Sequence, residues 1–332
     1  MPTQVLICDD SNVARKQMAR TLPSDWDMTV HFAANGAEGI DAIKDGRGEV
    51  LFLDLNMPVM DGYEVLQAIR DQDLPAMVIV VSGDIQPEAY QRVMALGALD
   101  FIKKPASDEQ IADILLKYGV YTKSEVKLAP QITGAGQTEY RDAYQEIANV
   151  AMGRAGDLLA RLLDVFVILD IPSVNMLDSG ELKMALTHVD ENETVSAVCQ
   201  GFIGYGIAGE AFLIFNESSY SDIGELLKCE DELDETLELE LLMDISNVLV
   251  GACLKGVADQ LDINFSQGQP VVLGRHVTIA DIIKRNASRW DEILAIEISY
   301  SIENRNINCD LMLLFTGDSL AALNARAKFL IE

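Results

Sequence analysis

The chain has 332 residues and a formal net charge of −28 at pH 7, and 49% of its residues are hydrophobic. This length favours two domains, and the acidic balance argues against binding to nucleic acid or to anionic membranes. No apolar run approaches the roughly 20 residues of a membrane span, and the N-terminus lacks the basic region of a signal peptide. We therefore expect a cytoplasmic protein. Its five cysteines and three histidines show no paired metal-site or redox spacing.

Residues 4–118 alternate between short apolar runs and amphipathic segments. This pattern is typical of a doubly wound α/β domain, in which helices cover both faces of a parallel sheet. We predict strands at Gln4–Cys8, Thr29–Ala33, Val50–Asp54, Met77–Ser82 and Phe101–Lys103. We predict helices at Asn12–Thr21, Gly36–Asp45, Tyr63–Arg70, Pro87–Leu96 and Asp108–Tyr118.

Polar side chains stand at the ends of four of these strands. They are Asp9 and Asp10 after the first, Asp54 at the third, Ser82 at the fourth and the pair Lys103–Lys104 at the fifth. Ligands of such sheets bind at the carboxyl ends of the strands, where the strand order reverses. Three carboxylates there would repel one another unless a cation lay among them, and oxygen ligands favour Mg²⁺. Acids that only cap the following helices are the alternative, but capping does not account for an acid, a hydroxyl and a lysine at four strand ends.

These residues closely resemble the motifs of the response-regulator receiver family. The matching segments are Asp9-Asp10, the run DLNMPVMDG from Asp54 to Gly62, Ser82-Gly83 and Lys104-Pro105. The resemblance covers the whole predicted domain, residues 1–121. It implies a five-stranded parallel-sheet fold and phosphorylation by a cognate histidine kinase.

The same resemblance implies a role for each motif residue. Asp54 is expected to be the phosphoacceptor, and Lys104, which directly precedes the proline as the family's lysine does, is expected to contact the phosphoryl group. Ser82 takes the place of the switch hydroxyl and Phe101 that of the switch aromatic residue. The expected Mg²⁺ ligands are Asp9, Asp10, Asp54 and the carbonyl of Asn56.

A segment without strong periodicity separates this domain from the rest of the chain. We predict a flexible linker at residues 122–137, with an end-to-end distance of roughly 20–24 Å, and a second domain at residues 138–332. In that domain a helix of about 25 residues is expected from Glu139, and a second near Glu235–Leu261. Two strand pairs are expected as well, Thr194–Ile203 with Ala211–Phe215 and Ile293–Ile302 with Asp310–Phe315.

Two segments of the second domain, 98 residues apart, repeat each other position by position. Each copy has an acid, a second acid four residues later and an asparagine three residues after that, so these side chains share one helix face. The offset grows to 100 at Phe215 and Phe315, which a two-residue difference in a hairpin turn would explain. The repeat predicts internal pseudo-two-fold symmetry. The repeated polar residues are Asp142, Glu146 and Asn149 in the first copy and Glu240, Asp244 and Asn247 in the second.

An asparagine is unfavourable inside a helix, and one interpretation is that Asn149 and Asn247 are tolerated surface residues inherited by duplication. The combination of acids, asparagine and a following glycine resembles the CheC-like phosphatase family, which includes CheX and FliY. The resemblance covers most of residues 138–332. It implies catalytic roles for Glu146, Asn149, Asp244 and Asn247. The second copy departs from the family pattern, because Asp244 is one methylene shorter than glutamate, and such misplacement can cost on the order of 10²-fold in rate.

The two resemblances together imply a chemotaxis-type response regulator whose second domain hydrolyses the aspartyl phosphate of a receiver domain. The substrate receiver would belong to a chemotaxis regulator or to the chain itself, and phosphorylation of Asp54 would control the activity. Asn149 would orient a water molecule, and Glu146 would dock on the receiver lysine equivalent to Lys104. We expect both side chains on an exposed helix face. A homodimer is a further assembly open to the chain.

The alternative function is a non-enzymatic adaptor that binds chemotaxis or flagellar proteins under control of Asp54 phosphorylation. The altered second motif favours this alternative. A transcription factor is disfavoured by the acidic charge and by the absence of a basic recognition helix.

Overall fold

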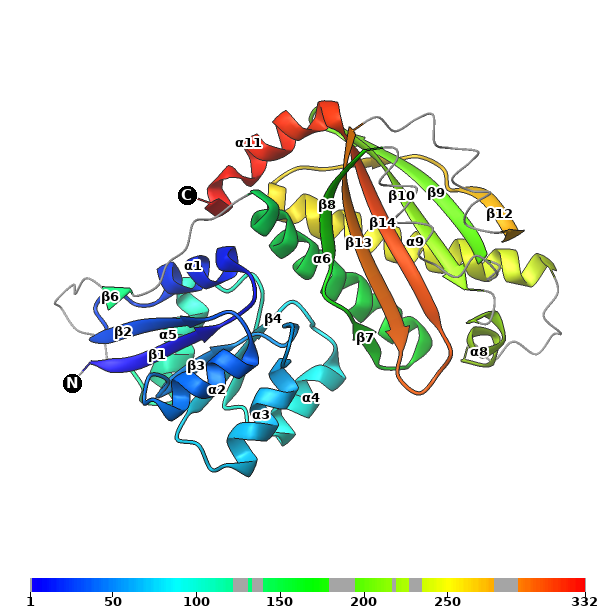
Figure 1. Ribbon diagram of the computed structural model, residues 1–332. Coiled ribbons are helices and arrows are strands. Elements are labelled where there is room, and N and C mark those ends of the chain that lie inside the picture. The colour runs from blue at the N-terminus through cyan, green and yellow to red at the C-terminus, as the bar shows by residue number, and fades with distance from the viewer. Residues whose placement is uncertain are drawn as a thin grey trace. The chain divides into compact units, whose positions relative to one another are not determined.

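The computed structural model describes residues 2–121, 131–132, 140–178, 195–216, 219–226, 235–277 and 292–331 (Figure 1). The chain divides into two compact units, Met1–Glu146 with Leu330–Glu332, and Ile147–Phe329. The first unit contains a parallel sheet and the second an antiparallel sheet, each packed with helices. The predicted α/β fold class is therefore confirmed.

The parallel sheet of the first unit has the strand order β5-β4-β3-β1-β2-β6. All its neighbouring strands pair in parallel. The chain order reverses between β1 and β3, so the carboxyl ends of these two strands flank the switch point of the sheet. The strands are β1 (Thr3–Cys8), β2 (Met28–Ala33), β3 (Val50–Leu53), β4 (Met77–Ser82), β5 (Asp100–Lys103) and β6 (Gln131–Ile132).

Five helices cover the two faces of this sheet. Alternate residues of β1 point to opposite sides: Leu6 and Cys8 pack into one core cluster with residues of α2 and α3, whereas Val5 and Ile7 pack into another with residues of α1 and α5. Both faces are apolar, which explains the continuous hydrophobic runs of the strands. The helices are α1 (Asn12–Thr21), α2 (Gly36–Lys44), α3 (Gly62–Asp71), α4 (Pro87–Ala95) and α5 (Asp108–Lys117), each within one residue of its predicted bounds.

The sixth strand, β6, falls inside the predicted linker. Its residues Gln131 and Ile132 pair with Thr29 and Val30 of β2. Two residues are too few for a periodic signal, so the sequence did not predict this strand. The remainder of the predicted linker at 122–137 lies outside the described residues.

The antiparallel sheet of the second unit is built on two hairpins, β9–β10 and β13–β14, and both predicted strand pairs are confirmed. The sheet runs β11-β9-β10-β14-β13-β7, with β12 also paired to β9 and β8 to β13. The short strands β7, β8, β11 and β12 were not predicted. The strands are β7 (Val167–Leu169), β8 (Ser173–Asp178), β9 (Val195–Gly204), β10 (Ile207–Asn216), β11 (Ser266–Gln267), β12 (Val271–Val277), β13 (Glu292–Ile302) and β14 (Asn308–Thr316).

Strand register shows the predicted pseudo-two-fold symmetry. At the centre of the sheet Phe212 of β10 pairs with Met312 of β14, its own counterpart at an offset of 100 residues. In the first hairpin the two strands are connected by only two residues, Tyr205 and Gly206. In the second hairpin Ile302 bonds to Ile307, which leaves the four-residue connection 303–306. The predicted two-residue difference between the turns is thus present.

Two long helices, α6 and α9, lie against one another in the second unit and run past its sheet (Figure 1). The Gln260 amide of α9 donates to the carbonyl of Ile147 in α6 at 2.9 Å. Arg154 of α6 pairs with Asp259 of α9 at 2.6 Å. The remaining helices are short. The helices are α6 (Tyr140–Leu163), α8 (Ser219–Leu226), α9 (Glu235–Leu261), α11 (Leu320–Ile331) and the 3-10 helix Gly317–Ser319.

The exposure of two leucines of α6 differs from expectation. The helical spacing of the apolar residues of α6 predicts a buried stripe that includes Ile147, Val150, Leu158, Leu159 and Leu162. Ile147, Val150 and Leu159 are buried, whereas Leu158 and Leu162 are 46% and 41% exposed. Within the described residues, one helical stretch, 237–261 of α9, is long and apolar enough to cross a membrane. Because 67% of its most apolar window is buried inside the fold, it has the character of a core helix.

The packing of α6 against α9 leads to a prediction about the free energy of unfolding. At Gly256 an added Cβ would lie 2.7 Å from the Cα of Ala151, whereas at Gly251 it would meet nothing within 4 Å. Gly256→Ala should lower the free energy of unfolding by about 1–2 kcal/mol, because the steric cost exceeds the gain in helix propensity. Gly251→Ala is the matched control and should raise it by about 0.5–1 kcal/mol. Urea denaturation measures both, and equal stability of the two variants would contradict the packing described.

Candidate functional site

Three carboxylates meet at the switch point of the parallel sheet. Asp9 and Asp10 directly follow β1, and Asp54 directly follows β3. Each offers an oxygen within 4.8 Å of those of the other two. Asp9 and Asp54 are 5% and 3% exposed, so the acids lie in the protein interior and not on its surface. The predicted convergence of strand-end acids is therefore present.

The loop after β1 is held by the start of α1. The Ser11 amide donates to Oδ1 of Asp9 at 2.8 Å, and the Ser11 hydroxyl accepts from the amide of Ala14 as the helix cap. The Arg15 guanidinium donates to the backbone carbonyls of Asp9 and Asp10. These bonds orient both acids, and Arg15 was missed in the sequence, although its position one turn after the cap could have indicated it.

A glycine shapes the other side of the pocket. Gly62 opens α3 and its amide donates to the carbonyl of Leu55 at 2.9 Å. A Cβ at this position would clash with the carbonyl oxygen of Asp54. Asp61 caps the helix and forms a reciprocal capping box with Glu64. Any side chain at Gly62 would therefore displace the backbone that positions Asp54.

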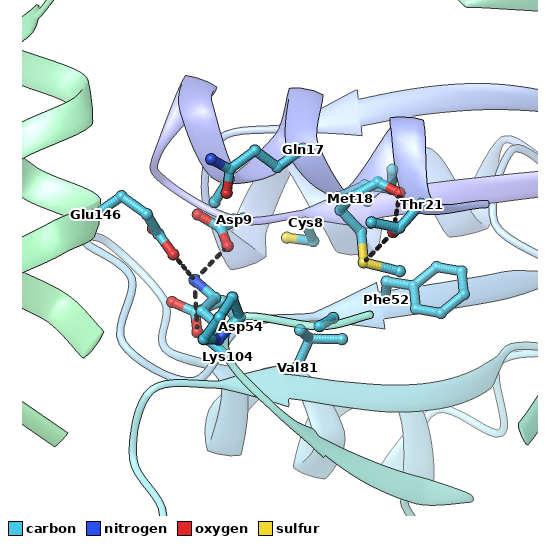
Figure 2. Close-up of a pocket in the computed structure, with 14 residues that line it drawn as sticks. Cys8, Asp9, Gln17, Met18, Thr21, Phe52, Asp54, Val81, Lys104 and Glu146 are labelled. Carbon is cyan, nitrogen blue, oxygen red and sulfur yellow. Dashed lines mark hydrogen bonds and ion pairs between the residues drawn. The ribbon is translucent and has the colours of Figure 1, made fainter. Parts of the chain in front are cut away.

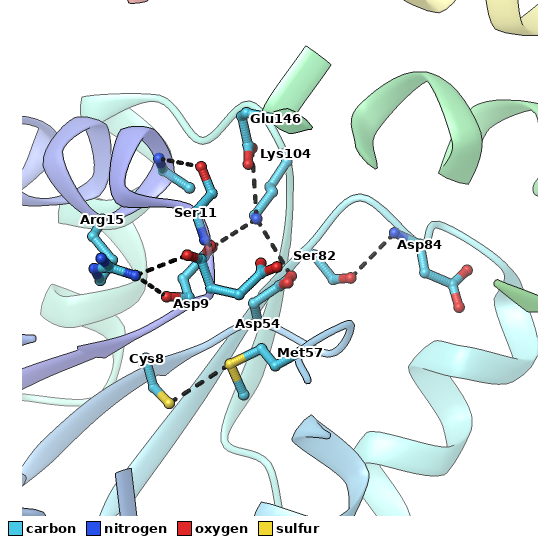
Figure 3. A network of polar contacts seen from close by, with 12 residues as sticks. Cys8, Asp9, Ser11, Arg15, Asp54, Met57, Ser82, Asp84, Lys104 and Glu146 are labelled. Carbon is cyan, nitrogen blue, oxygen red and sulfur yellow. Dashed lines mark hydrogen bonds and ion pairs between the residues drawn. The ribbon is translucent and has the colours of Figure 1, made fainter. Parts of the chain in front are cut away.

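Lys104, which directly follows strand β5, lies among these acids (Figure 3). Lys104 Nζ donates to Oδ2 of Asp9 at 2.7 Å and lies 3.4 Å from Oδ1 of Asp54. Lys104 is 8% exposed, whereas its neighbour Lys103 is exposed. The structure thus brings together Lys104, the lysine that the sequence motif selected, and the acids.

A fourth carboxylate also reaches this lysine. Glu146, the last residue of Met1–Glu146 in the first unit, places Oε1 3.5 Å from Lys104 Nζ (Figure 2). The two side chains are 6% and 5% exposed, and the pocket lined by Asp9, Asp54 and Lys104 also includes Glu146. The other oxygen of Glu146 is buried without a hydrogen-bond partner among the described residues.

Burial and mutual repulsion perturb the acids. Burial, followed by the charge of Asp9, raises the pKa of Asp10 to about 7, against the opposing effect of Lys104. Burial likewise raises the pKa of Asp54 and of Glu146, again opposed by Lys104. Burial acts to lower the pKa of Lys104, but Asp54, Asp9 and Glu146 outweigh it and hold that pKa well above its usual value. The lysine therefore stays charged, and it balances only part of the negative charge around it.

The donor set suits a hard divalent cation. Carboxylate oxygens are the ligands that such ions prefer, and Oδ1 of Asp10 is buried with no hydrogen-bond partner in the described part of the chain. Asn56, the expected carbonyl ligand, is half-buried two residues beyond Asp54. These residues fit the cation that the sequence predicted.

The two expected switch residues lie on neighbouring strands β4 and β5. Ser82 is 1% exposed, and its hydroxyl accepts from the amide of Asp84 at 3.1 Å. Phe101 is half-buried and packs edge-on against Tyr90, with ring centroids 6.0 Å apart.

The repeated motifs differ sharply in exposure. Glu146 and Asn149 of α6 are each 5% exposed, and both amide atoms of Asn149 are buried without partners among the described residues. Asp244 and Asn247 of α9 are exposed. The expectation that the first motif lies on an exposed helix face is therefore wrong.

The sequence around each asparagine explains this difference. The residues next to Asn149 along α6 are apolar and buried. They occupy positions 147, 148, 150, 151 and 152. A helix that is apolar all round is buried. In α9, by contrast, Ile245 and Leu249 are buried while Asn247 is exposed, so the helix keeps a polar stripe here.

Comparison with known proteins identifies the first unit. Residues 5–116 match the response regulator receiver domain family. This segment is a receiver domain. The chain is 32% identical over 152 residues to protein-glutamate methylesterase/protein-glutamine glutaminase 3 of Geobacter sulfurreducens, a match covering 46% of this chain. The match spans 40% of the length of that relative.

Solved structures are also similar to parts of the chain. FliY of Thermotoga maritima is 18% identical with a TM-score of 0.46, covering 59% of this chain and 99% of the FliY chain. A chain of the CheX-CheY-BeF3-Mg+2 complex of Borrelia burgdorferi is 28% identical with a TM-score of 0.34, covering 36% of this chain and 92% of that chain.

The buried acids predict a specific pH dependence. Because the folded-state pKa of Asp10 is raised from 3.8 to about 7, the folded receiver binds more protons than the unfolded chain between these values. Its stability should therefore fall as the pH rises through this window. In EDTA, Asp10→Asn should raise the free energy of unfolding on the order of 2 kcal/mol at pH 8, and by much less at pH 5.

The exposed acid Asp113 on α5 provides the matched control. Asp113→Asn should change stability little at either pH. Urea denaturation at both pH values makes the comparison. If Asp10→Asn gained the same stability at pH 5 as at pH 8, the buried charge would not be its cause.

Proposed function

We propose that this chain is a response regulator whose second domain hydrolyses the aspartyl phosphate of a receiver domain. The receiver would occupy residues 1–121, the linker 122–137 and the phosphatase domain 138–332. The observation that carries the proposal is the contact of Glu146 with Lys104, beside Asp54. The motif acid thereby reaches the lysine that the sequence motif predicts as its docking residue.

In the receiver, Asp54 is proposed to accept a phosphoryl group from a cognate histidine kinase. Its carboxylate oxygen forms a bond to phosphorus as the bond between phosphorus and the kinase's histidine nitrogen breaks, and Lys104 beside it neutralises charge on the phosphoryl oxygens. Mg²⁺, bound by Asp9, Asp10, Asp54 and the Asn56 carbonyl, would supply further neutralisation of the phosphoryl oxygens. Ser82 and Phe101, in the proposed switch roles, would respond to the phosphorylated state.

In the second domain, two residues of the first motif have different roles in the hydrolysis. Glu146 holds the receiver lysine, and the Asn149 carboxamide aims a water molecule at phosphorus, opposite the bond to the aspartyl oxygen. Asn149 is suited to this role because its amide atoms are buried and have no hydrogen-bond partner in the described part of the chain. Phosphoryl transfer depends chiefly on such positioning and on charge stabilisation.

The second motif, Asp244 and Asn247, is proposed as a weaker copy of the same site. Its exposed position leaves it accessible. The aspartate side chain is one methylene shorter than glutamate, so its carboxylate would fall short of a receiver lysine.

The phosphatase proposal predicts an asymmetric effect of the two asparagines. Asn149→Ala should slow phosphate release from the phosphorylated full-length chain on the order of 10²-fold, because the water loses its orienting group. Asn247→Ala should slow it less. Arg161→Ala is the control, since this side chain lies on α6 with 61% exposure and makes an i,i+4 ion pair with Asp157. Unchanged release in the double asparagine variant, folded by circular dichroism, would refute the assignment.

The receiver proposal predicts metal-dependent labelling at one residue. Acetyl phosphate should transfer its phosphoryl group to the chain in the presence of Mg²⁺, and EDTA should abolish the transfer because the acids then repel the incoming group. Asp54→Ala should remove the label, whereas Asp113→Ala, at an exposed acid of α5, should retain it. Labelled intact protein mass measures both, and a label that persists in Asp54→Ala would place the phosphoacceptor elsewhere.

A further inference from the structure

We infer that Arg15 is a positioning residue for the divalent cation of the receiver: its guanidinium holds the backbone of Asp9 and Asp10 so that their carboxylates meet the ion. The inference rests on the Mg²⁺ site of the proposed function. It adds to that site a residue that acts through the metal ligands and does not contact the ion.

The sheet fixes only part of the backbone that carries the two acids. The amide of Asp54 donates to the carbonyl of Cys8 at 2.9 Å, and the amide of Asp9 donates to the carbonyl of Ala33 at 3.1 Å. Strand β1 ends at Cys8, so the carbonyl of Asp9 and the whole of Asp10 lie beyond it. The orientation of the second acid therefore depends on contacts outside the sheet.

Arg15 supplies these contacts (Figure 3). Its Nη1 donates to the carbonyl of Asp9 and, at 3.1 Å, to the carbonyl of Asp10. The guanidinium presents its N–H donors in a rigid, planar fork, so one group can hold two successive carbonyls in a fixed arrangement. The Asp10 side chain adds little of its own, because its Oδ1 is buried with no hydrogen-bond partner among the described residues.

The place of Arg15 in its helix supports the same role. Arg15 is the fourth residue of α1, and its amide donates to the carbonyl of Ser11 at 3.0 Å. The amino end of a helix carries a partial positive charge, so a cationic side chain in the first turn is unfavourable. The bonds to the two carbonyls offset this disadvantage.

The atoms to which Arg15 bonds distinguish it from Lys104. The Lys104 ammonium donates to a carboxylate oxygen of Asp9 at 2.7 Å, and it thereby occupies an oxygen that a cation could use. Arg15 bonds to main-chain oxygens and leaves the carboxylate oxygens available. It can therefore orient both acids without competing with the ion. Groups that orient metal ligands in this way typically contribute about 10- to 100-fold to metal affinity.

The test measures the affinity of the full-length protein for Mg²⁺ by isothermal titration calorimetry. Loss of a positive charge would by itself tighten the binding of a cation, whereas loss of positioning weakens it. We expect Arg15→Met to bind Mg²⁺ about 10-fold more weakly than the native chain. Lys103→Met is the matched control, because it removes a positive charge from an exposed side chain at the end of β5. We expect its affinity to be unchanged or slightly higher.

Labelling of Asp54 by acetyl phosphate separates positioning from a general loss of structure. R15M should need about 10-fold more Mg²⁺ for its half-maximal labelling rate, and it should approach the native rate at saturating Mg²⁺, because the bound ion restores the arrangement of the acids. Arg15→Lys keeps the charge, but its nitrogen lies one bond nearer the backbone. It should also bind Mg²⁺ more weakly, and it decides the question if R15M does not fold.

The possible results distinguish the inference from the proposed metal site. Native or tighter affinity in R15M or R15K, an equal loss of affinity in K103M, or a labelling rate of R15M that stays low at saturating Mg²⁺ would overturn the role of Arg15 and leave the metal site in place. Failure of the native chain to bind Mg²⁺ would instead overturn the metal site and the inference with it.

Discussion

The charge balance around the Lys104 ammonium is the constraint on which the site depends. Asp9, Asp54 and Glu146 surround this one cation, and the half-buried Asp10 adds a fourth carboxylate nearby. The parallel sheet imposes this crowding, because β1, β3 and β5 end at the same edge and deliver their terminal side chains together. A single lysine offsets only part of this charge, and the excess of carboxylates favours a cation in the pocket. Burial, followed by the charge of Asp9, raises the pKa of Asp10 to about 7.

Much of the receiver could be predicted from the sequence because its signals are local. Most of the strands are apolar runs, four of the five predicted strands end in polar residues, and capping residues such as Ser107 and Asp61 mark helix starts. The hairpins of the second unit were also predictable, since the repeat identifies equivalent strands and the difference between its turns. Short strands such as β6 and β11 carry no periodic signal in two residues and depend on a neighbouring strand edge for their bonds. They could not be predicted from their own residues.

The sequence predicted which residues form the candidate site, but it predicted only part of their surroundings. The motif after β3 and the lysine before the proline indicated which groups would meet, whereas the exposure of Asn149 depends on apolar neighbours at positions 147–152 that the motif does not include. The hydrophobic run around Asn149 was visible in the sequence, and it outweighs the presence of one amide in deciding whether that helix face is buried. The 3.5 Å approach of Glu146 to Lys104 joins residues 42 positions apart and is a tertiary contact. No local pattern specifies it.

The two copies of the polar motif lie in different environments. In α6 the asparagine is buried and the acid meets a lysine, whereas in α9 the acid is shortened and both side chains are exposed. An unsatisfied buried amide costs about 1–3 kcal/mol in stability, so a fold that retains Asn149 carries a cost that packing alone does not repay. Asn247 bears no such cost, because water satisfies it. Unsatisfied polar groups persist in native structures chiefly where function requires them. This cost is borne by the buried copy and not by the exposed one, and it is what a functional role of Asn149 would offset.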